Sequence, residues 1–197
     1  MADIQIKDKV FTPFLSEEQI QKKIEAVAQR INTDYEGKTP LMVSVLNGSF
    51  RFMNDLFRYI SIPVEAAFVR VSSYQGTQSS GKIKEVLGLD IDIKGRHVIV
   101  VEDIVDTGLT INQIKEQLVQ RMPDSFEVAA LLLKPDCLRQ EVSLRYLGFE
   151  IPNEFVVGYG LDYDNLGREL NDIYKLKVAF FPYYSFRITN IASFKRN

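Results

Sequence analysis

The segment HVIVV, residues 97–101, constrains the fold of this chain more than any other stretch. It is continuous and rich in β-branched residues, which is typical of a strand buried on both faces. Such strands occur mainly in parallel sheets that helices cover on both sides. Similar apolar runs alternate with helical patterns along the chain. The sequence therefore predicts an α/β fold, with a doubly wound, mainly parallel twisted sheet flanked by helices.

The spacing of apolar residues predicts the individual elements. Ser16 begins a helix, because Gln19 three residues later completes a capping box. A second helix is predicted over 51–60, and a third follows Thr110, which we expect to cap it. The predicted apolar faces of the three helices are Ile20, Ile24, Val27 and Ile31; Phe52, Leu56 and Tyr59 or Ile60; and Ile111, Ile114 and Leu118. Strands are predicted over 41–46, 64–74, 97–101, 126–134 and 154–160, with a returning strand over 85–91.

Composition excludes several classes of protein. The 197 residues fit one domain, and a net charge of -2 gives no overall electrostatic footprint for nucleic acid or an anionic membrane. The single cysteine, Cys137, rules out a disulfide framework and a cysteine-based zinc site. The single histidine, His97, stands at the start of a strand, so we assign it a structural role. Without a signal-peptide pattern or a membrane-length apolar run, the expectation is a cytoplasmic protein.

The buried strand runs directly into acidic and hydroxyl side chains. Glu102 and Asp103 come first, Asp106 follows, and Thr107, Gly108 and Thr110 form a small turn before the third helix. In open α/β sheets, ligands bind beyond the carboxyl ends of the strands. The turn and the helix N-terminus offer backbone N–H groups that suit a phosphate.

The two adjacent carboxylates suit a different part of a ligand. Glu102 and Asp103 can accept hydrogen bonds from paired hydroxyl groups and can hold a hard cation such as Mg2+. A sugar phosphate carries both chemical features, so we expect one here. The alternative is an acidic surface turn that only caps a helix. The stretch is neither a P-loop nor a dinucleotide-binding glycine turn.

Two further segments lie outside this alternation of strands and helices. Residues 72–84, SSYQGTQSSGKIK, are rich in Ser, Gly and Gln, which favours a mobile loop, with a plain hairpin tip as the alternative. The aromatic and partly basic tail, residues 177–197, is interpreted as packing or a subunit contact.

The segment VVEDIVDTGLT, residues 100–110, resembles the diphosphosugar-binding signature of the type I phosphoribosyltransferases. Four other segments resemble parts of the hypoxanthine-guanine phosphoribosyltransferases in the same order. They are the first loop (SVLNGSFRFMNDL), the Ser-Tyr catalytic loop (SSYQGTQSSGKIK), the purine-reading lysine segment (LLLKPD) and the C-terminal hood (GFEIPNEFVVGYGLDYDNLGREL). The resemblance covers roughly residues 10 to 175.

This resemblance implies the type I phosphoribosyltransferase fold in a single domain, residues 1–197. Its core would span about residues 35–145, and its small hood subdomain would comprise the N-terminal segment and about residues 146–197. The implied reaction joins hypoxanthine or guanine to 5-phosphoribosyl 1-diphosphate, giving IMP or GMP and diphosphate. The implied cofactor is Mg2+. The implied assembly is a homodimer or homotetramer, with no nucleic-acid or membrane partner.

The resemblance also implies roles for individual residues. Asp106 would face purine N7 as the acid/base residue, and Ser73 and Tyr74 would close over the reacting centre. The 5'-phosphate and ribose would be bound by Glu102, Asp103, Asp106, Thr107, Gly108, Leu109 and Thr110. The purine would be bound by Ile104, Lys134, Phe155, Val156 and Asp162. The diphosphate would be bound by Asn47, Gly48 and Arg168, and Mg2+ by Glu102, Asp103 and Asp162.

Each assignment has a structural alternative. Lys134 could extend to solvent from the end of its strand, and Phe155 could be a core residue. Tyr74 could be an exposed aromatic residue in a loop, and Arg168 could pair with a neighbouring carboxylate on a helix face. The order and spacing of all the segments favour the functional interpretation over these alternatives.

The sequence departs from the family in the first loop. Asn47 stands where the family often carries a basic residue, which puts side-chain contacts to the diphosphate in doubt. The resemblance also predicts a cis peptide bond between Leu46 and Asn47.

Two other functions compete with purine salvage. One is a regulator that senses 5-phosphoribosyl 1-diphosphate, but the chain lacks a nucleic-acid-binding appendage or a strong basic excess. The other is an enzyme of the same fold acting on a pyrimidine, against which the hood segment argues.

Overall fold

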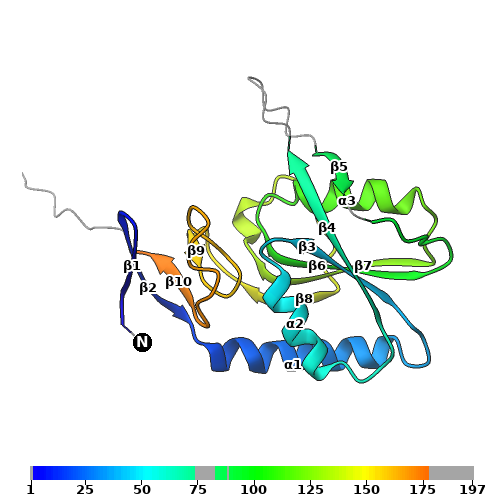
Figure 1. The fold of residues 1–197 in the computed structure, drawn as a ribbon, viewed down its shortest axis with the longest axis horizontal. Coiled ribbons are helices and arrows are strands. Elements are labelled where there is room, and N and C mark those ends of the chain that lie inside the picture. Colours follow the sequence, from blue (N-terminus) through cyan, green and yellow to red (C-terminus); the bar gives the residue numbers. More distant parts are fainter. Residues whose placement is uncertain (1, 74–82, 88, 178–197) are drawn as a thin grey trace, which may run out of the picture.

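The computed structural model describes residues 2–73, 83–87 and 89–177. A six-stranded sheet forms the larger layer, in the order β5-β4-β3-β6-β7-β8 (Figure 1). Five of its strands are parallel, and β5 returns antiparallel to β4 at one edge. The predicted α/β fold is confirmed. The strands are β3 Leu41–Leu46, β4 Glu65–Ser73, β5 Ile83–Leu87, β6 His97–Val105, β7 Ser125–Leu133 and β8 Tyr146–Glu150.

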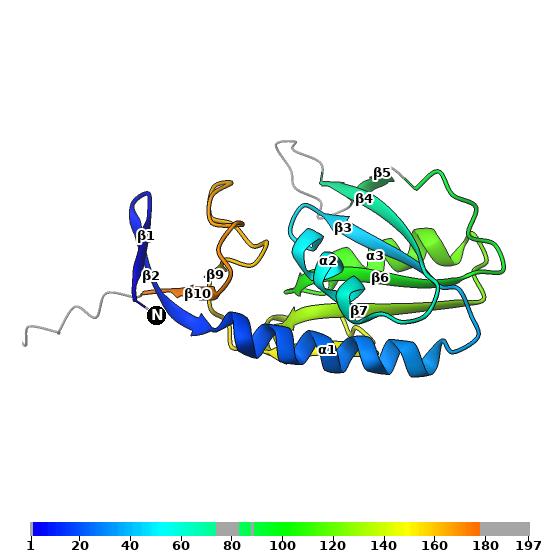
Figure 2. The same ribbon diagram turned by 60° about the horizontal axis from the view of Figure 1, so that its bottom comes forward.

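Helices cover both faces of this sheet (Figure 2). Helices α1 Glu17–Asp34 and α2 Phe50–Tyr59 pack on one face, and α3 Leu109–Val119 packs on the other. The strand β6 shows why both faces need a cover. Ile99 and Val101 lie in the core beneath α1 and α2, whereas Val98 and Val100 lie in the core beneath α3. The prediction of a strand buried on both faces is therefore confirmed.

The two ends of the described chain meet in a second, four-stranded antiparallel sheet. Its order is β1-β2-β10-β9, and β10 Ile173–Leu176 pairs with both β2 and β9. This small sheet stands beside the main sheet near the start of α1 (Figure 1). Its core consists of Ile6, Phe11, Val157 and Tyr174. Its other strands are β1 Ile4–Ile6, β2 Lys9–Leu15 and β9 Val156–Val157.

Several sequence predictions agree with the structure at the level of single residues. The side-chain oxygen of Ser16 accepts a hydrogen bond from the backbone N–H of Gln19, and the reciprocal bond completes the predicted capping box. The predicted apolar residues of all three helices are buried, except that Tyr59 and Ile60 at the end of α2 are only partly buried. His97 stacks edge-on against Tyr35 and contacts the hydroxyl group of Ser125, 2.8 Å from its Nδ1. Its predicted structural role fits these contacts.

Four predicted boundaries were wrong. The returning strand predicted over 85–91 is β5 Ile83–Leu87, and residues 89–91 lie outside it. The strand over 97–101 continues to Val105, so Glu102 and Asp103 lie within β6 rather than after its end. Thr110 does not cap α3: Gly108 occupies that position with a left-handed backbone (φ 78°), and Thr110 is inside the first turn. The strand predicted over 154–160 is reduced to β9, because the chain turns at glycines with positive φ immediately after it.

Candidate functional site

The carboxyl ends of the adjacent strands β3, β6 and β7 bring three loops together. These strands are parallel neighbours in the main sheet, so residues 47–49, 106–108 and 134 follow them at the same edge. The peptide bond between Leu46 and Asn47 is cis, which confirms that prediction. The structure thus places the predicted diphosphate, phosphate and lysine segments at one edge, where open α/β sheets bind ligands.

One buried carboxylate, Glu102, and one partly buried carboxylate, Asp103, lie at the end of β6. Glu102 is 8% exposed, and its Oε2 has no hydrogen-bond partner among the residues that the structure describes. Burial raises the pKa of Glu102 well above its ordinary value, and the neighbouring charge of Asp103 raises it further. Burial likewise raises the pKa of Asp103 to about 6, although the positive charge of Arg168 opposes the shift. An unpartnered buried acceptor suits a ligand that donates hydrogen bonds or carries positive charge.

The loop after β3 packs directly on these carboxylates. A Cβ atom at Gly48 would lie 1.5 Å from Oδ2 of Asp103, so any other residue there would displace the Asp103 carboxylate. Asn47 accepts a hydrogen bond from Nη2 of Arg70 at 3.2 Å. The neighbouring strand β4 thus supplies a basic group beside the residue where the family often has one, a contribution that the sequence reading missed because the two positions are far apart in the chain.

The turn between β6 and α3 has the form of a phosphate-binding loop. Residues 109–111 present the first N–H groups of α3, which have no acceptor within the helix. The helix dipole favours an anion at this end. The segment after β7 supports the turn: Arg139 donates its backbone N–H to the carbonyl of Thr107 at 3.0 Å. A Cβ atom at Gly108 would lie 2.6 Å from Val142, so the turn is packed from behind as well.

Lys134 is held inside the site rather than extended to solvent. It is 7% exposed, and its Nζ lies 3.2 Å from Oδ2 of Asp106, whose side chain is half exposed. The backbone explains the contact, because Lys134 donates its N–H to the carbonyl of Val105 at the end of β6. Cys137 also lies against Asp106, and burial together with this contact raises the pKa of its thiol. The sequence reading used Cys137 only to exclude disulfides and missed this position.

A loop of the smaller sheet closes the site from the other side. Arg168 forms a 2.5 Å ion pair with Asp162 and donates to the carbonyl of Gly160 at 2.6 Å. A Cβ atom at Gly160 would lie 2.1 Å from the carbonyl oxygen of Gly48, so the two loops touch. The predicted diphosphate residues from both loops are therefore adjacent in space.

Phe155 is not a core residue. It is 44% exposed, with its ring near those of Phe11 and Tyr163 at centroid distances of 6.2 and 5.9 Å. Val156, the next residue, is buried in β9 and fixes the backbone there. An exposed ring held by two aromatic neighbours is suited to stacking on a planar ligand.

The remaining predicted residues are placed less completely. Ser73 is the last residue of β4, and Tyr74 and most of the predicted loop 72–84 lie outside the described residues, as does nearly all of the aromatic tail. Ile104 lies in β6, and Leu109 and Thr110 lie in the first turn of α3, on either side of the turn of residues 106–108.

The described residues contain no group of three His, Cys, Asp or Glu side chains close enough to hold a metal alone. Glu102, Asp103 and Asp162 thus do not form a complete cluster. Mg2+, however, is usually held by one or two carboxylates together with water and substrate oxygens. The unpartnered oxygen of Glu102 and the adjacent Asp103 fit that kind of coordination.

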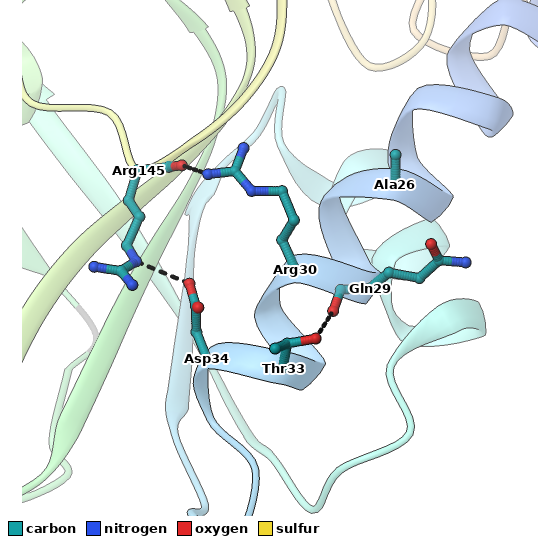
Figure 3. A pocket seen from close by; sticks show the side chains of 6 residues that line it. All are labelled: Ala26, Gln29, Arg30, Thr33, Asp34 and Arg145. Carbon is teal, nitrogen blue, oxygen red and sulfur yellow. Dashed lines mark hydrogen bonds and ion pairs between the residues drawn. The ribbon is translucent and has the colours of Figure 1, made fainter.

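A separate hollow lies at the opposite edge of the sheet (Figure 3). Arg145 precedes β8, and its Nε donates to Asp34 near the C-terminus of α1 at 2.9 Å. Arg30 donates to the backbone carbonyl of Arg145 at 2.8 Å. These charged groups already satisfy one another, and a helix C-terminus repels anions. We therefore assign this hollow a structural role. None of the described helices is long and apolar enough to cross a membrane.

Comparison with known proteins agrees with this geometry. Residues 14–164 match the phosphoribosyl transferase domain family, the class that the fold and the site define. The chain is 45% identical to hypoxanthine-guanine phosphoribosyltransferase of Mycobacterium tuberculosis, over 81% of this chain and 82% of the relative. It is 38% identical to the enzyme of that name from Bacillus subtilis, over 89% and 98%. A crystal structure of a hypoxanthine-guanine phosphoribosyltransferase from Bacillus anthracis superposes with a TM-score of 0.78 and 38% identity, covering 88% of this chain and 99% of that one.

The chain belongs to the hypoxanthine-guanine phosphoribosyltransferase family.

The raised pKa of Asp103 predicts an unusual pH dependence of stability. Its folded pKa of about 6 lies above the ordinary value of 3.8, so the folded state binds the proton more tightly than the unfolded state. This contribution to stability is present at low pH and is lost as the pH rises through 6. Between pH 4.5 and 7.5, the free energy of unfolding should fall by on the order of 2 kcal/mol more in the unsubstituted protein than in Asp103→Asn.

Urea unfolding at the two pH values measures this difference. Asp34→Asn is the matched control, because hydrogen bonds from Arg145 and Tyr146 lower the pKa of Asp34. It titrates below the tested window, so its substitution should leave the pH dependence there unchanged. A pH dependence that is the same with and without the Asp103 carboxyl would contradict the assignment.

Proposed function

We propose that this chain is a purine-salvage enzyme that converts hypoxanthine or guanine and 5-phosphoribosyl 1-diphosphate into IMP or GMP and diphosphate. Membership of the family supports the reaction. The observation that carries the choice of base is the buried Lys134 held at 3.2 Å from Asp106. An ammonium group fixed beside a carboxylate offers one donor and one acceptor to the edge of a purine.

The sugar diphosphate would lie across the carboxyl edge of the sheet. Its 5'-phosphate would bind the N–H groups at the start of α3, and its ribose hydroxyls would donate to Glu102 and Asp103. The unpartnered Oε2 of Glu102 supports this placement. Arg168 and the backbone at Gly48 would hold the diphosphate. Bound Mg2+ would neutralise negative charge on the leaving diphosphate.

The base would stack on the exposed ring of Phe155, with the backbone of Val156 at its edge. Lys134 would donate to the 6-oxo group, whereas the 6-amino group of adenine would place donor against donor. The bond to the anomeric carbon would form as the diphosphate leaves, through an oxocarbenium-like transition state. Asp106 would accept a proton from purine N7 as N9 attacks, and loss of this proton makes the purine a better nucleophile.

The proposal also includes Mg2+ as the cofactor, a homodimer or homotetramer as the assembly and the cytoplasm as the location. These follow from the family resemblance. The described structure supports the first through the carboxylates at the end of β6.

A spectrophotometric assay of nucleotide formation tests the proposed function. Purified protein, Mg2+ and 5-phosphoribosyl 1-diphosphate are combined separately with hypoxanthine, guanine, xanthine, adenine and uracil. We expect turnover with hypoxanthine or guanine that is lost when Mg2+ is chelated. No turnover with any base, together with retained binding of the sugar diphosphate, would instead indicate a sensor.

Replacement of the acid/base residue should separate turnover from binding. In Asp106→Asn we expect kcat to fall by about 100-fold or more, while the Kd for 5-phosphoribosyl 1-diphosphate changes by less than about threefold, because the backbone of the loop remains. Steady-state kinetics and calorimetry measure the two effects. Asp136→Asn, an exposed carboxylate on the short helix Pro135–Cys137, is the control. Equal losses in turnover and binding would refute the acid/base role.

Loss of the buried ammonium group should weaken base selectivity. Lys134→Met keeps the length of the aliphatic stem and removes the donor. The ratio of kcat/KM for hypoxanthine to that for adenine should fall by about tenfold or more. Kinetics with both bases measure the ratio, and Lys115→Met on the exposed side of α3 is the control. An unchanged ratio would show that another group reads the 6-position.

A further inference from the structure

A second buried carboxylate lies outside the proposed substrate site. Asp55 is on α2 and is only 7% exposed. Its Oδ2 accepts hydrogen bonds from the hydroxyl group of Tyr159 and, at 2.5 Å, from Nε2 of Gln21, while Oδ1 accepts from Asn54 at 3.1 Å. A buried carboxylate is costly unless such donors satisfy it. Truncation of one donor therefore loosens a defined connection between α2 and the loop that contains Tyr159.

Arg51, one turn earlier on the same helix, makes a second connection to that loop. Its Nη1 donates to the carbonyls of Glu169 and Leu170 at 2.8 and 2.7 Å, and its Nη2 donates to Oδ1 of Asn171 at 2.7 Å. Its guanidinium group also lies 5.0 Å from the ring centre of Tyr159. The planar guanidinium holds three acceptors at once, which a lysine cannot reproduce with the same geometry.

These contacts fall on both sides of the proposed diphosphate residue. Tyr159 precedes and residues 169–171 follow the stretch that contains Asp162 and Arg168. The backbone N–H of Tyr159 donates to the carbonyl of Leu170 at 2.8 Å, which closes the base of this loop. At the other end of the connection, α2 begins immediately after residues 47–49. One helix thus joins the two loops that would hold the diphosphate.

We propose that Arg51, Asp55 and Tyr159 form a latch that sets Arg168 at the correct distance from the loop of residues 47–49. The three are positioning residues: they act through Arg168 and do not themselves touch the substrate. This inference rests on the proposed function, because it concerns the affinity for 5-phosphoribosyl 1-diphosphate. The close approach of Gly160 to the carbonyl of Gly48 leaves little tolerance for a shift of either loop.

The main sheet offers a matched control. Tyr146 is also fully buried and donates its hydroxyl hydrogen to a carboxylate, Asp34, at 2.8 Å. This pair lies at the opposite edge of the sheet, beside the hollow of Figure 3. Tyr159→Phe and Tyr146→Phe therefore each remove one hydroxyl group that a buried tyrosine donates to a carboxylate. A purely structural role predicts the same kinetic effect from both substitutions.

The experiment measures thermal unfolding, steady-state kinetics and the calorimetric Kd for 5-phosphoribosyl 1-diphosphate with Mg2+. The proteins are the unsubstituted chain, Tyr159→Phe, Tyr146→Phe and Arg51→Lys. Arg51→Lys keeps the positive charge at a partly buried position. It therefore provides a second test of the proposal if Tyr159→Phe does not fold. We expect Tyr159→Phe and Arg51→Lys to raise the KM and Kd for the sugar diphosphate by about tenfold. The KM for the base should stay within about twofold, because β9 and β10 hold Phe155 independently.

Equal kinetics for Tyr159→Phe and Tyr146→Phe would overturn the latch, as would a KM and Kd unchanged in Arg51→Lys. If the unsubstituted chain binds the sugar diphosphate without turning over any base, the proposed function fails, and the Kd ratios still decide the latch. If the unsubstituted chain neither binds the sugar diphosphate nor forms a nucleotide, the proposed function and the latch are both wrong.

Discussion

The packing of two carboxylates at the end of an otherwise apolar strand is the constraint on which the site depends. Burial of Glu102 and Asp103 is unfavourable for their charged forms, and it raises the pKa of both. Core contacts on both faces of β6 stabilise the strand and offset the free energy lost by burying these carboxylates. Gly48, which has no side chain, lets the backbone loop after β3 lie directly against the Asp103 carboxylate. The unpartnered Oε2 of Glu102 leaves one hydrogen bond for the proposed ligand to complete.

Periodicity predicted the layers of the fold because most of its stabilisation comes from apolar burial, which follows the period of each element. The continuous apolar run of residues 97–101 predicted a parallel sheet, and the helical spacing of apolar residues from Ile20 to Ile31 predicted α1. Boundaries failed where polar residues lie inside an element. The strand β6 keeps its hydrogen bonds to β7 through Glu102, although the side chains there change from apolar to acidic.

The candidate site could be predicted as a set of segments, because each segment is local in sequence. Contacts between segments were beyond the sequence, since nothing in a local pattern relates Arg70 to Asn47 or Arg51 to residues 169–171. The wrong cap assignment has the same origin. Thr110 has the right chemistry for a helix cap, but the left-handed backbone of Gly108 is selected by packing against residues 138–142.

The pairing of β2 with β10 has a consequence for the order in which the molecule can be built. All six strands of the main sheet have been synthesised once residue 150 is reached, so that sheet can form while synthesis continues. The N-terminal strands, although made first, have no partner in β10 until residues 173–176 emerge. The side of the molecule that would receive the base is therefore completed last. A nascent or truncated chain that lacks β10 would have the proposed phosphate site at the edge of the main sheet. It would lack the small sheet that holds the proposed purine-stacking ring.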